Sequence, residues 1–171
     1  DAHVYALDAA TGRRLWDYST GKSWVIGTPA LRDGVVYAGT SDSARFFALD
    51  AGSGRLLFNV DTRAYVFSSA ALCGPRAYVG CHNGTLYAFD ARTGALDWSF
   101  RTEGSRRDPL KLLDADLRLD PAAFHPVTGD FGDMYIDFYR FTTVGGIMAS
   151  PAVVDGVVYV GSLDGRLYAL R

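Results

Sequence analysis

Short apolar runs separated by turn residues mark most of the chain. The run at residues 35–38 follows the Asp-Gly pair at 33–34, and the run at 157–160 follows another Asp-Gly pair at 155–156. An Asp-Gly pair between alternating apolar runs is a strong signal for a two-residue β-hairpin turn. The 19 glycines and the 13% aromatic content agree with this pattern. We therefore predict short antiparallel strands joined by tight turns.

Two sequence patterns recur along the chain. The first contains Ala-x-Asp-x-x-Thr-Gly-x-x-x-Trp in its fullest form, and its copies occupy residues 4–16, 46–58 and 86–98, with a last copy beginning at 167–170. The second occupies residues 29–39, 70–80 and 151–161. Asp8, Asp50 and Asp90 fall 42 and 40 residues apart, so the repeat has a period near 40.

The period predicts the fold class. Each unit accommodates four short strands, A to D, and four strands in every ~40 residues are typical of β-propeller blades. Ala88 and Ala169 lie 81 residues apart, or two periods, so one diverged unit is expected between them. We predict one all-β domain over residues 1–171, a partial propeller of four-stranded antiparallel blades. Its units are 1–27 (strands C and D), 28–67, 68–104, 105–148 (diverged) and 149–171 (strands A to C).

The first pattern has a structural interpretation. Its aspartate ends a strand and can accept hydrogen bonds from the following turn, where the Thr hydroxyl contributes and the glycine suits a positive φ. The aromatic residue then packs between neighbouring blades, and the alanine leaves room for it. This predicted docking motif comprises Ala6, Asp8, Thr11, Gly12, Trp16, Ala48, Asp50, Gly54, Phe58, Ala88, Asp90, Thr93, Gly94 and Trp98. We expect Trp16 and Trp98 to be mostly buried.

These motifs resemble the PQQ-like β-propeller repeat family. The resemblance implies bacterial relatives of three kinds: quinoprotein dehydrogenases, the scaffold of the outer-membrane barrel assembly machinery, and sensor domains attached to kinases. A dehydrogenase would imply PQQ, Ca²⁺, an aspartate base and two adjacent half-cystines. Cys73 and Cys81 are eight residues apart and too distant in a hairpin to form a disulfide. We therefore expect no cofactor, no metal and no catalytic residue, and a location in the periplasm or cell envelope.

The length of the chain does not determine how many blades the complete propeller has or whether two copies form it. The resemblance implies seven or eight blades, roughly 300 residues at ~40 per blade, whereas this chain has 171. Three alternatives remain at this stage: an excerpt or divergent member, a half-propeller that pairs with a second copy through residues 13–19, or a closed four-bladed monomer. The residues from Asp1 onward lack the basic and apolar regions of a signal peptide; removal of such a peptide and an excerpt of a longer chain are both left open.

The diverged unit is the candidate site for specific function. We expect a strand at residues 134–143, with Phe138 replacing the docking tryptophan, and no helix outside residues 105–133. Residues 110–119 fit either a helix or a strand. The aspartates in this unit suggest a solvated acidic loop, with a calcium site as the alternative. Phe124, Tyr135 and Tyr139 form a candidate contact surface for a protein partner or a second copy of the chain.

Charge and hydropathy exclude two classes of function. A formal net charge of −2 excludes a strongly basic nucleic-acid binder, and the most apolar stretch is interrupted by Pro151, Asp155 and glycines, so no transmembrane segment is predicted. His82 lies beside a hairpin turn and is expected to be exposed. The Asn83-Gly84-Thr85 sequon is interpreted as a tight turn. We predict a non-enzymatic scaffold or protein-binding module; the alternatives are part of a PQQ-dependent dehydrogenase or a ligand-sensing propeller.

Overall fold

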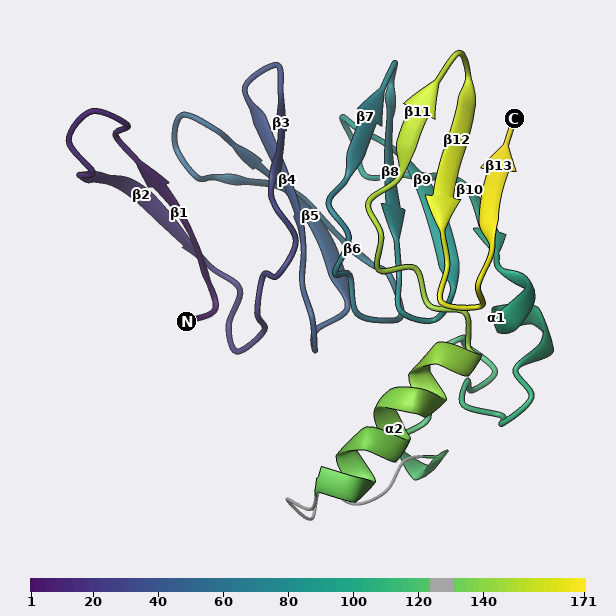
Figure 1. Ribbon diagram of the computed structural model, residues 1–171. Helices are drawn as coiled ribbons and strands as arrows, with labels where there is room; N and C mark the ends of the chain where they lie inside the picture. Colours follow the sequence, from purple (N-terminus) through teal and green to yellow (C-terminus); the bar gives the residue numbers. More distant parts are fainter. Residues whose placement is uncertain (124–130) are drawn as a thin grey trace.

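The computed structural model describes residues 1–123 and 131–171 (Figure 1). Phe124 therefore lies outside the described residues. Within the described part, the strands form four antiparallel sheets of two, four, four and three strands, as expected for a partial all-β propeller. The first two sheets comprise β1 (His3–Leu7) and β2 (Arg14–Ser19), then β3 (Ala30–Arg32), β4 (Val35–Gly39), β5 (Arg45–Asp50) and β6 (Leu56–Asp61). The other two comprise β7 (Ala71–Cys73), β8 (Arg76–Gly80), β9 (Thr85–Asp90) and β10 (Leu96–Arg101), then β11 (Ala152–Val154), β12 (Val157–Gly161) and β13 (Leu167–Leu170).

The hairpins form at the predicted Asp-Gly pairs. Asp33 and Gly34 have φ values of 51° and 75°, and Asp155 and Gly156 have 49° and 74°. Positive φ at both central residues is the geometry of a type I′ turn, whose twist matches that of the flanking strands. Local sequence therefore determines these strand pairings directly.

The sheets stand side by side like blades, each packing its face against the next (Figure 1). Phe46, Phe58 and Phe89 belong to the core between the sheets β3–β6 and β7–β10. Leu86, Ile147 and Val158 belong to the core between the sheets β7–β10 and β11–β13. Each of these sheets thus buries an apolar face on the next sheet along the chain.

That segment, residues 105–148, is not a blade. Its described residues contain α1 (Glu103–Arg107), the 3-10 helix η1 (Pro121–Ala123) and α2 (Phe131–Thr143), with one isolated bridge between Leu113 and Leu119. The sheet β11–β13 follows β7–β10 directly, and their inner strands β11 and β7 contact each other. The 81-residue interval between Ala88 and Ala169 is therefore one repeat plus an insertion. The expectation that residues 105–148 form a diverged four-stranded blade was wrong.

The expected strand at 134–143 was also wrong, because these residues belong to α2. Phe131, Tyr135 and Tyr139 recur every fourth residue, which is a helical period, and Arg140 forms an ion pair with Asp137 three positions earlier, 3.7 Å away. Phe138 lies in this helix and cannot replace a strand tryptophan; its side chain lies outside the described part. Helix also extends beyond 105–133, because α1 begins at residue 103 and α2 ends at 143.

Hydrogen bonds locate the insertion. In the preceding blade, the Thr62 hydroxyl donates to the carbonyl of Ala64, two residues along the chain. The corresponding Thr102 hydroxyl donates to the carbonyl of Gly145, 43 residues along. Residues 103–145 thus take the place of the two-residue link 63–64 of the preceding blade. We call residues 103–145 the insertion.

The strand register resumes unchanged after the insertion. The N–H of Ile147 donates to the carbonyl of Cys81, as the N–H of Val66 donates to that of Thr40 one blade earlier, both at 2.9 Å. The insertion therefore leaves the blade-to-blade contact as it is elsewhere in the repeat.

We predict that the blades fold without the insertion. Replacing residues 103–145 by Arg-Ala, the link of the preceding blade, should keep the β-sheet signal in circular dichroism and a cooperative urea transition. The urea midpoint should fall, because the replacement removes Leu112 and Val144, which are buried in the intact chain. Loss of the β-sheet signal would show that the insertion is required for the blades.

Candidate functional site

The Asp-x-x-Thr-Gly segments form the same closed turn three times. One carboxylate oxygen of Asp8 accepts from both the N–H and the hydroxyl of Thr11, at 2.8 and 2.7 Å. Asp90 and Thr93 repeat this geometry at 2.8 and 2.7 Å, and Asp50 repeats it with the serine at 53. The hydroxyl hydrogen bond is the main reason that the pKa of each aspartate is lowered. These carboxylates are engaged in their own turns.

In the first two copies, the aromatic residue packs over the turn of the next blade. The Trp16 ring covers Gly54, where a Cβ would lie 2.7 Å from the ring, and its Nε1 donates to the carbonyl of Ala51 at 2.9 Å. Phe58 covers Gly94 in the same way, with a Cβ contact of 2.6 Å. The glycine therefore provides both the positive φ and the space for the ring.

Trp98 lies against the last blade. It packs with Tyr78, their ring centres 5.8 Å apart, and with the cluster that contains Val158. Trp16 and Trp98 are partly buried and Phe58 is buried. The motif alanines Ala6, Ala48 and Ala88 lie directly opposite these rings on the neighbouring strand, as the cross-strand partners of the three aromatics.

Tyr37 takes over a hydrogen bond that Phe58 cannot make. Its hydroxyl donates to the carbonyl of Ala91 at 3.0 Å, which is the counterpart of the bond from the Trp16 indole to Ala51. Sequence reasoning missed this role, because Tyr37 belongs to a different strand from the docking aromatic.

We predict that Trp16→Ala lowers the free energy of unfolding by about 2–4 kcal/mol, somewhat below the full range for a wholly buried ring. It removes both the contact with Gly54 and the indole hydrogen bond. Leu15→Ala is the matched control: Leu15 is exposed, and its loss should cost no more than about 0.5 kcal/mol. Urea melts measure both. Equal losses for the two variants would contradict the docking role.

The insertion is anchored to the blades by polar contacts. The Asn83 side-chain amide donates to the carbonyl of Leu117 at 2.9 Å, and Arg118 forms an ion pair with Asp61. Asn83 is fully buried, which agrees with its interpretation as a turn residue in place of a glycosylation site. The Asp114 carboxylate accepts the N–H groups of two later residues in its own loop. In the described segments no three His, Cys, Asp or Glu side chains converge as metal ligands.

His82 is buried beneath the insertion, contrary to the expectation of an exposed turn residue. Its ring lies 5.0 Å from that of Phe67, 5.1 Å from that of Phe141 in α2 and 6.0 Å from that of Tyr65. Its Nδ1 has no hydrogen-bond partner among the described residues. Burial lowers the pKa of His82 to about 4. The turn was correctly located, but the insertion that covers it was not foreseen.

This burial predicts a pH dependence of stability. The pKa of His82 is about 4 in the folded chain and has its ordinary value of 6.5 when the chain unfolds, so the unfolded state binds the proton more readily. Stability should be full above about pH 6.5 and fall toward pH 4 by up to about 3 kcal/mol. His82→Leu should flatten this window in urea melts at several pH values. If the free energy of unfolding of His82→Leu still fell with pH as it does in the original chain, His82 would not be the cause of the pH dependence.

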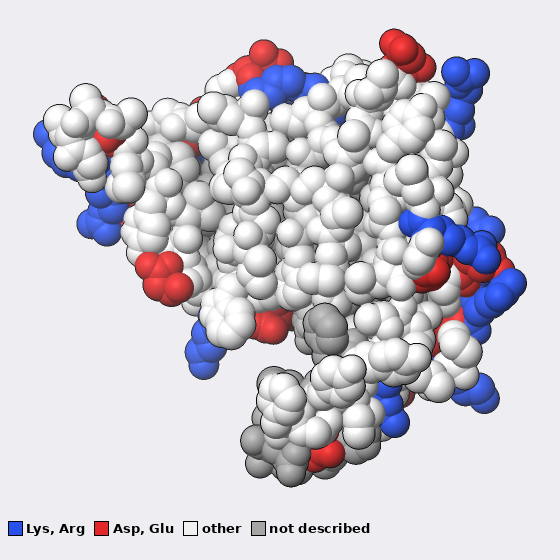
Figure 2. All heavy atoms as spheres, viewed as in Figure 1, with Lys and Arg blue, Asp and Glu red and all other residues white. Residues whose placement is uncertain are grey.

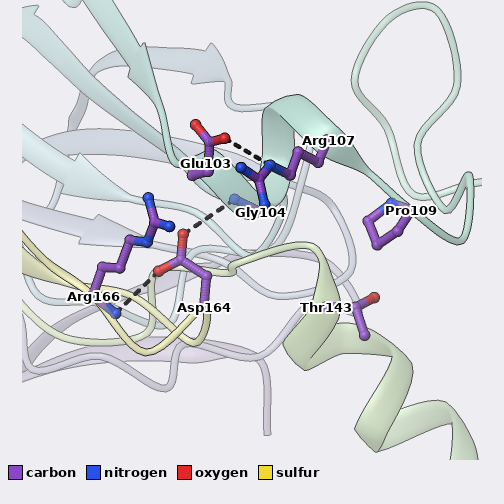
Figure 3. Close-up of a pocket in the computed structure, with 7 residues that line it drawn as sticks. All are labelled: Glu103, Gly104, Arg107, Pro109, Thr143, Asp164 and Arg166. Atoms are coloured by element: carbon purple, nitrogen blue, oxygen red, sulfur yellow. Dashed lines mark hydrogen bonds and ion pairs between the residues drawn. The ribbon is translucent and has the colours of Figure 1, made fainter.

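A small cavity of about 150 Å³ lies where the insertion leaves and re-enters the blades (Figure 3). Its charged side chains are largely paired with their surroundings. Glu103 and Arg107 form an ion pair of 2.7 Å, and the Asp164 carboxylate accepts the Gly104 N–H at 3.1 Å and the Tyr168 hydroxyl at 2.6 Å. This cluster ties α1 to the turn between β12 and β13, and we interpret it as a structural contact.

The outer side of α2 is exposed and apolar. Phe131, Tyr135 and Tyr139 follow one another at every fourth residue and are 74%, 63% and 63% exposed, with the exposed Ile136 beside them. We call these four residues the aromatic stripe. Figure 2 shows few charged side chains on the visible side of the lobe that α2 forms. Tyr135 and Tyr139 were predicted as contact residues; Phe131 and Ile136 were missed, because the segment was interpreted as a strand.

The four sheets and the aromatic-on-glycine docking define the chain as part of a β-propeller with antiparallel four-stranded blades. A family model described as outer membrane protein assembly factor BamB matches residues 1–122. The chain therefore belongs to this family of PQQ-like propeller repeats. No helix in the described part is both long and apolar enough to span a membrane.

Known relatives differ in their activities. The serine/threonine-protein kinase AfsK of Streptomyces griseus is 31% identical over 226 residues, covering 99% of this chain and 27% of the kinase. The quinohemoprotein alcohol dehydrogenase ADH IIB of Pseudomonas putida is 38% identical over 155 residues, covering 84% of this chain and 17% of the enzyme. The crystal structure of BamB from Moraxella catarrhalis matches with a TM-score of 0.67 at 22% identity, covering 98% of this chain and 43% of that one. The chain thus spans less than half the length of each of these proteins.

Proposed function

We propose that the chain is a non-enzymatic propeller module that binds a partner protein through its insertion. The aromatic stripe carries this proposal. Contiguous exposed aromatic surface is characteristic of protein contact sites, and tyrosine is enriched among the residues that dominate binding energy. The four side chains lie on one helix, so a partner can contact them together.

The repeat explains why the insertion is the favoured contact surface. In the blades, aspartate, threonine and aromatic side chains are used for turns and docking, as at Asp90, Thr93 and Phe58. The insertion leaves the blades between Thr102 and Gly145 and does not take part in this repeated packing. Its outer helix is therefore free to present side chains without weakening the contacts between blades.

We also propose that the module acts without PQQ or calcium. Cys73 and Cys81 do not form the adjacent half-cystines that the dehydrogenase resemblance would require: Cys73 is exposed at the end of β7, and Cys81 is buried directly after β8. Burial raises the pKa of the Cys81 thiol, which keeps it protonated and unreactive. Titration with PQQ and Ca²⁺ tests the enzyme alternative, because a saturable change in quinone absorbance would favour it.

The family supports a location and a kind of partner. The matching family is described as an outer membrane protein assembly factor, which supports the periplasm or cell envelope of a bacterium as the compartment. We infer a protein partner, either a separate protein or a second copy of this chain. Light scattering distinguishes these two, because a second copy would double the mass in solution.

We predict that the double variant Tyr135→Ala, Tyr139→Ala weakens partner association at least tenfold while the thermal midpoint stays within a few degrees, since both side chains are mainly exposed. Photo-crosslinking from benzoylphenylalanine at position 135 in cells would capture the partner, and the same probe at the exposed Leu96 on the blades is the control. Unfolding of the double variant, or equal capture from both positions, would contradict the proposal.

A further inference from the structure

A second surface lies at the opposite end of the blades from the insertion. A groove of about 570 Å³ lies between the sheets β3–β6 and β7–β10 and is lined in part by residues of the turns after β3, β7 and β9. These turns lie at the end of the blades away from α2 (Figure 1). We call it the inter-blade groove. It is lined by Arg32, Asp33, Val35, Tyr37, Leu57, Pro75, Asp90, Ala91 and Arg92. Both of its walls are complete four-stranded sheets, so its shape is set by described blades alone.

The walls of the groove are apolar. Val35, Leu57 and Pro75 contribute aliphatic surface, and Leu57 is 38% exposed although it is a large apolar residue. The Tyr37 ring forms part of the groove and is held in place by its hydrogen bond to the Ala91 carbonyl at 3.0 Å. The volume lies within the range of about 300–1,000 Å³ that is typical of small-molecule sites.

The rim carries two arginines and two aspartates, which differ in how fully they are paired. Arg32 forms an ion pair with Asp33 at 3.7 Å; the Arg32 side chain is 28% exposed and that of Asp33 is 91% exposed. The Asp90 carboxylate is occupied by hydrogen bonds from the Arg92 N–H, the Thr93 N–H and the Thr93 hydroxyl. Within the described residues, the guanidinium of Arg92 has no hydrogen-bond or ion-pair partner. The Arg92 guanidinium is therefore available to a ligand in the groove, whereas that of Arg32 is paired with Asp33.

We propose that the inter-blade groove binds a small amphipathic anion, with an apolar or aromatic body and one carboxylate. The body would pack on Val35, Leu57 and Pro75, which removes apolar surface from water. The carboxylate would pair with Arg92, whose planar guanidinium group suits carboxylate geometry. This site is independent of the aromatic stripe, because the two lie at opposite ends of the blades.

Three probes with the same ring system test the proposal by isothermal titration calorimetry. Indole-3-acetate carries the carboxylate, indole-3-acetamide is its neutral isostere, and tryptamine carries the opposite charge. We expect indole-3-acetate to bind about tenfold more tightly than the amide, with tryptamine the weakest. Equal affinities for acid and amide, tightest binding of tryptamine, or no binding of any probe would overturn the proposal.

Matched variants locate the site. Leu57→Glu and Arg92→Glu should each weaken indole-3-acetate binding about tenfold or more. Leu15→Glu, at the position of β2 that corresponds to Leu57 in β6, and Arg55→Glu, on the neighbouring turn, are the controls and should bind as the original chain does. All four side chains are exposed, so the variants should fold, and circular dichroism verifies this. Loss of binding in the controls, or retained binding in Leu57→Glu, would place the ligand elsewhere.

Discussion

An aromatic ring packed over a glycine is the contact on which the rest of the structure depends. Trp16 covers Gly54 and Phe58 covers Gly94 at distances that exclude any Cβ. The same glycines need a positive φ to close their turns. One residue thus serves the local turn and the contact between blades, so each blade can pack only when the turn of its neighbour has formed.

This nearest-neighbour packing explains how the propeller accommodates an insertion. In repeat architectures each unit contacts only its neighbours, so a long segment between two units costs little if the contact between them is kept. The entropy of closing a loop also grows slowly with its length. The Thr102 hydroxyl bond to Gly145 and the Ile147 bond to Cys81 preserve that contact here.

The two proposed sites differ in the way that the fold creates them. The aromatic stripe lies on a helix outside the repeat and carries side chains that no blade needs for packing. The inter-blade groove arises inside the repeat, between two complete blades that the Tyr37 to Ala91 hydrogen bond joins. A protein partner suits the exposed stripe and a small molecule suits the groove.

The sequence alone determined the repeat, the Asp-Gly hairpins and the aromatic residues that dock, because turn formation and the positions of Asp33, Gly34 and Trp16 depend on neighbours a few residues away. Only the tertiary structure decided that residues 103–145 form an insertion. These 43 residues replace a two-residue link and so lengthen the chain by 41 residues, about one period, which spacing could not distinguish from a blade. The hydrogen bond from Ile147 to Cys81 could. The burial of His82 and the inter-blade groove likewise depend on contacts between segments far apart in the chain, which no local pattern records.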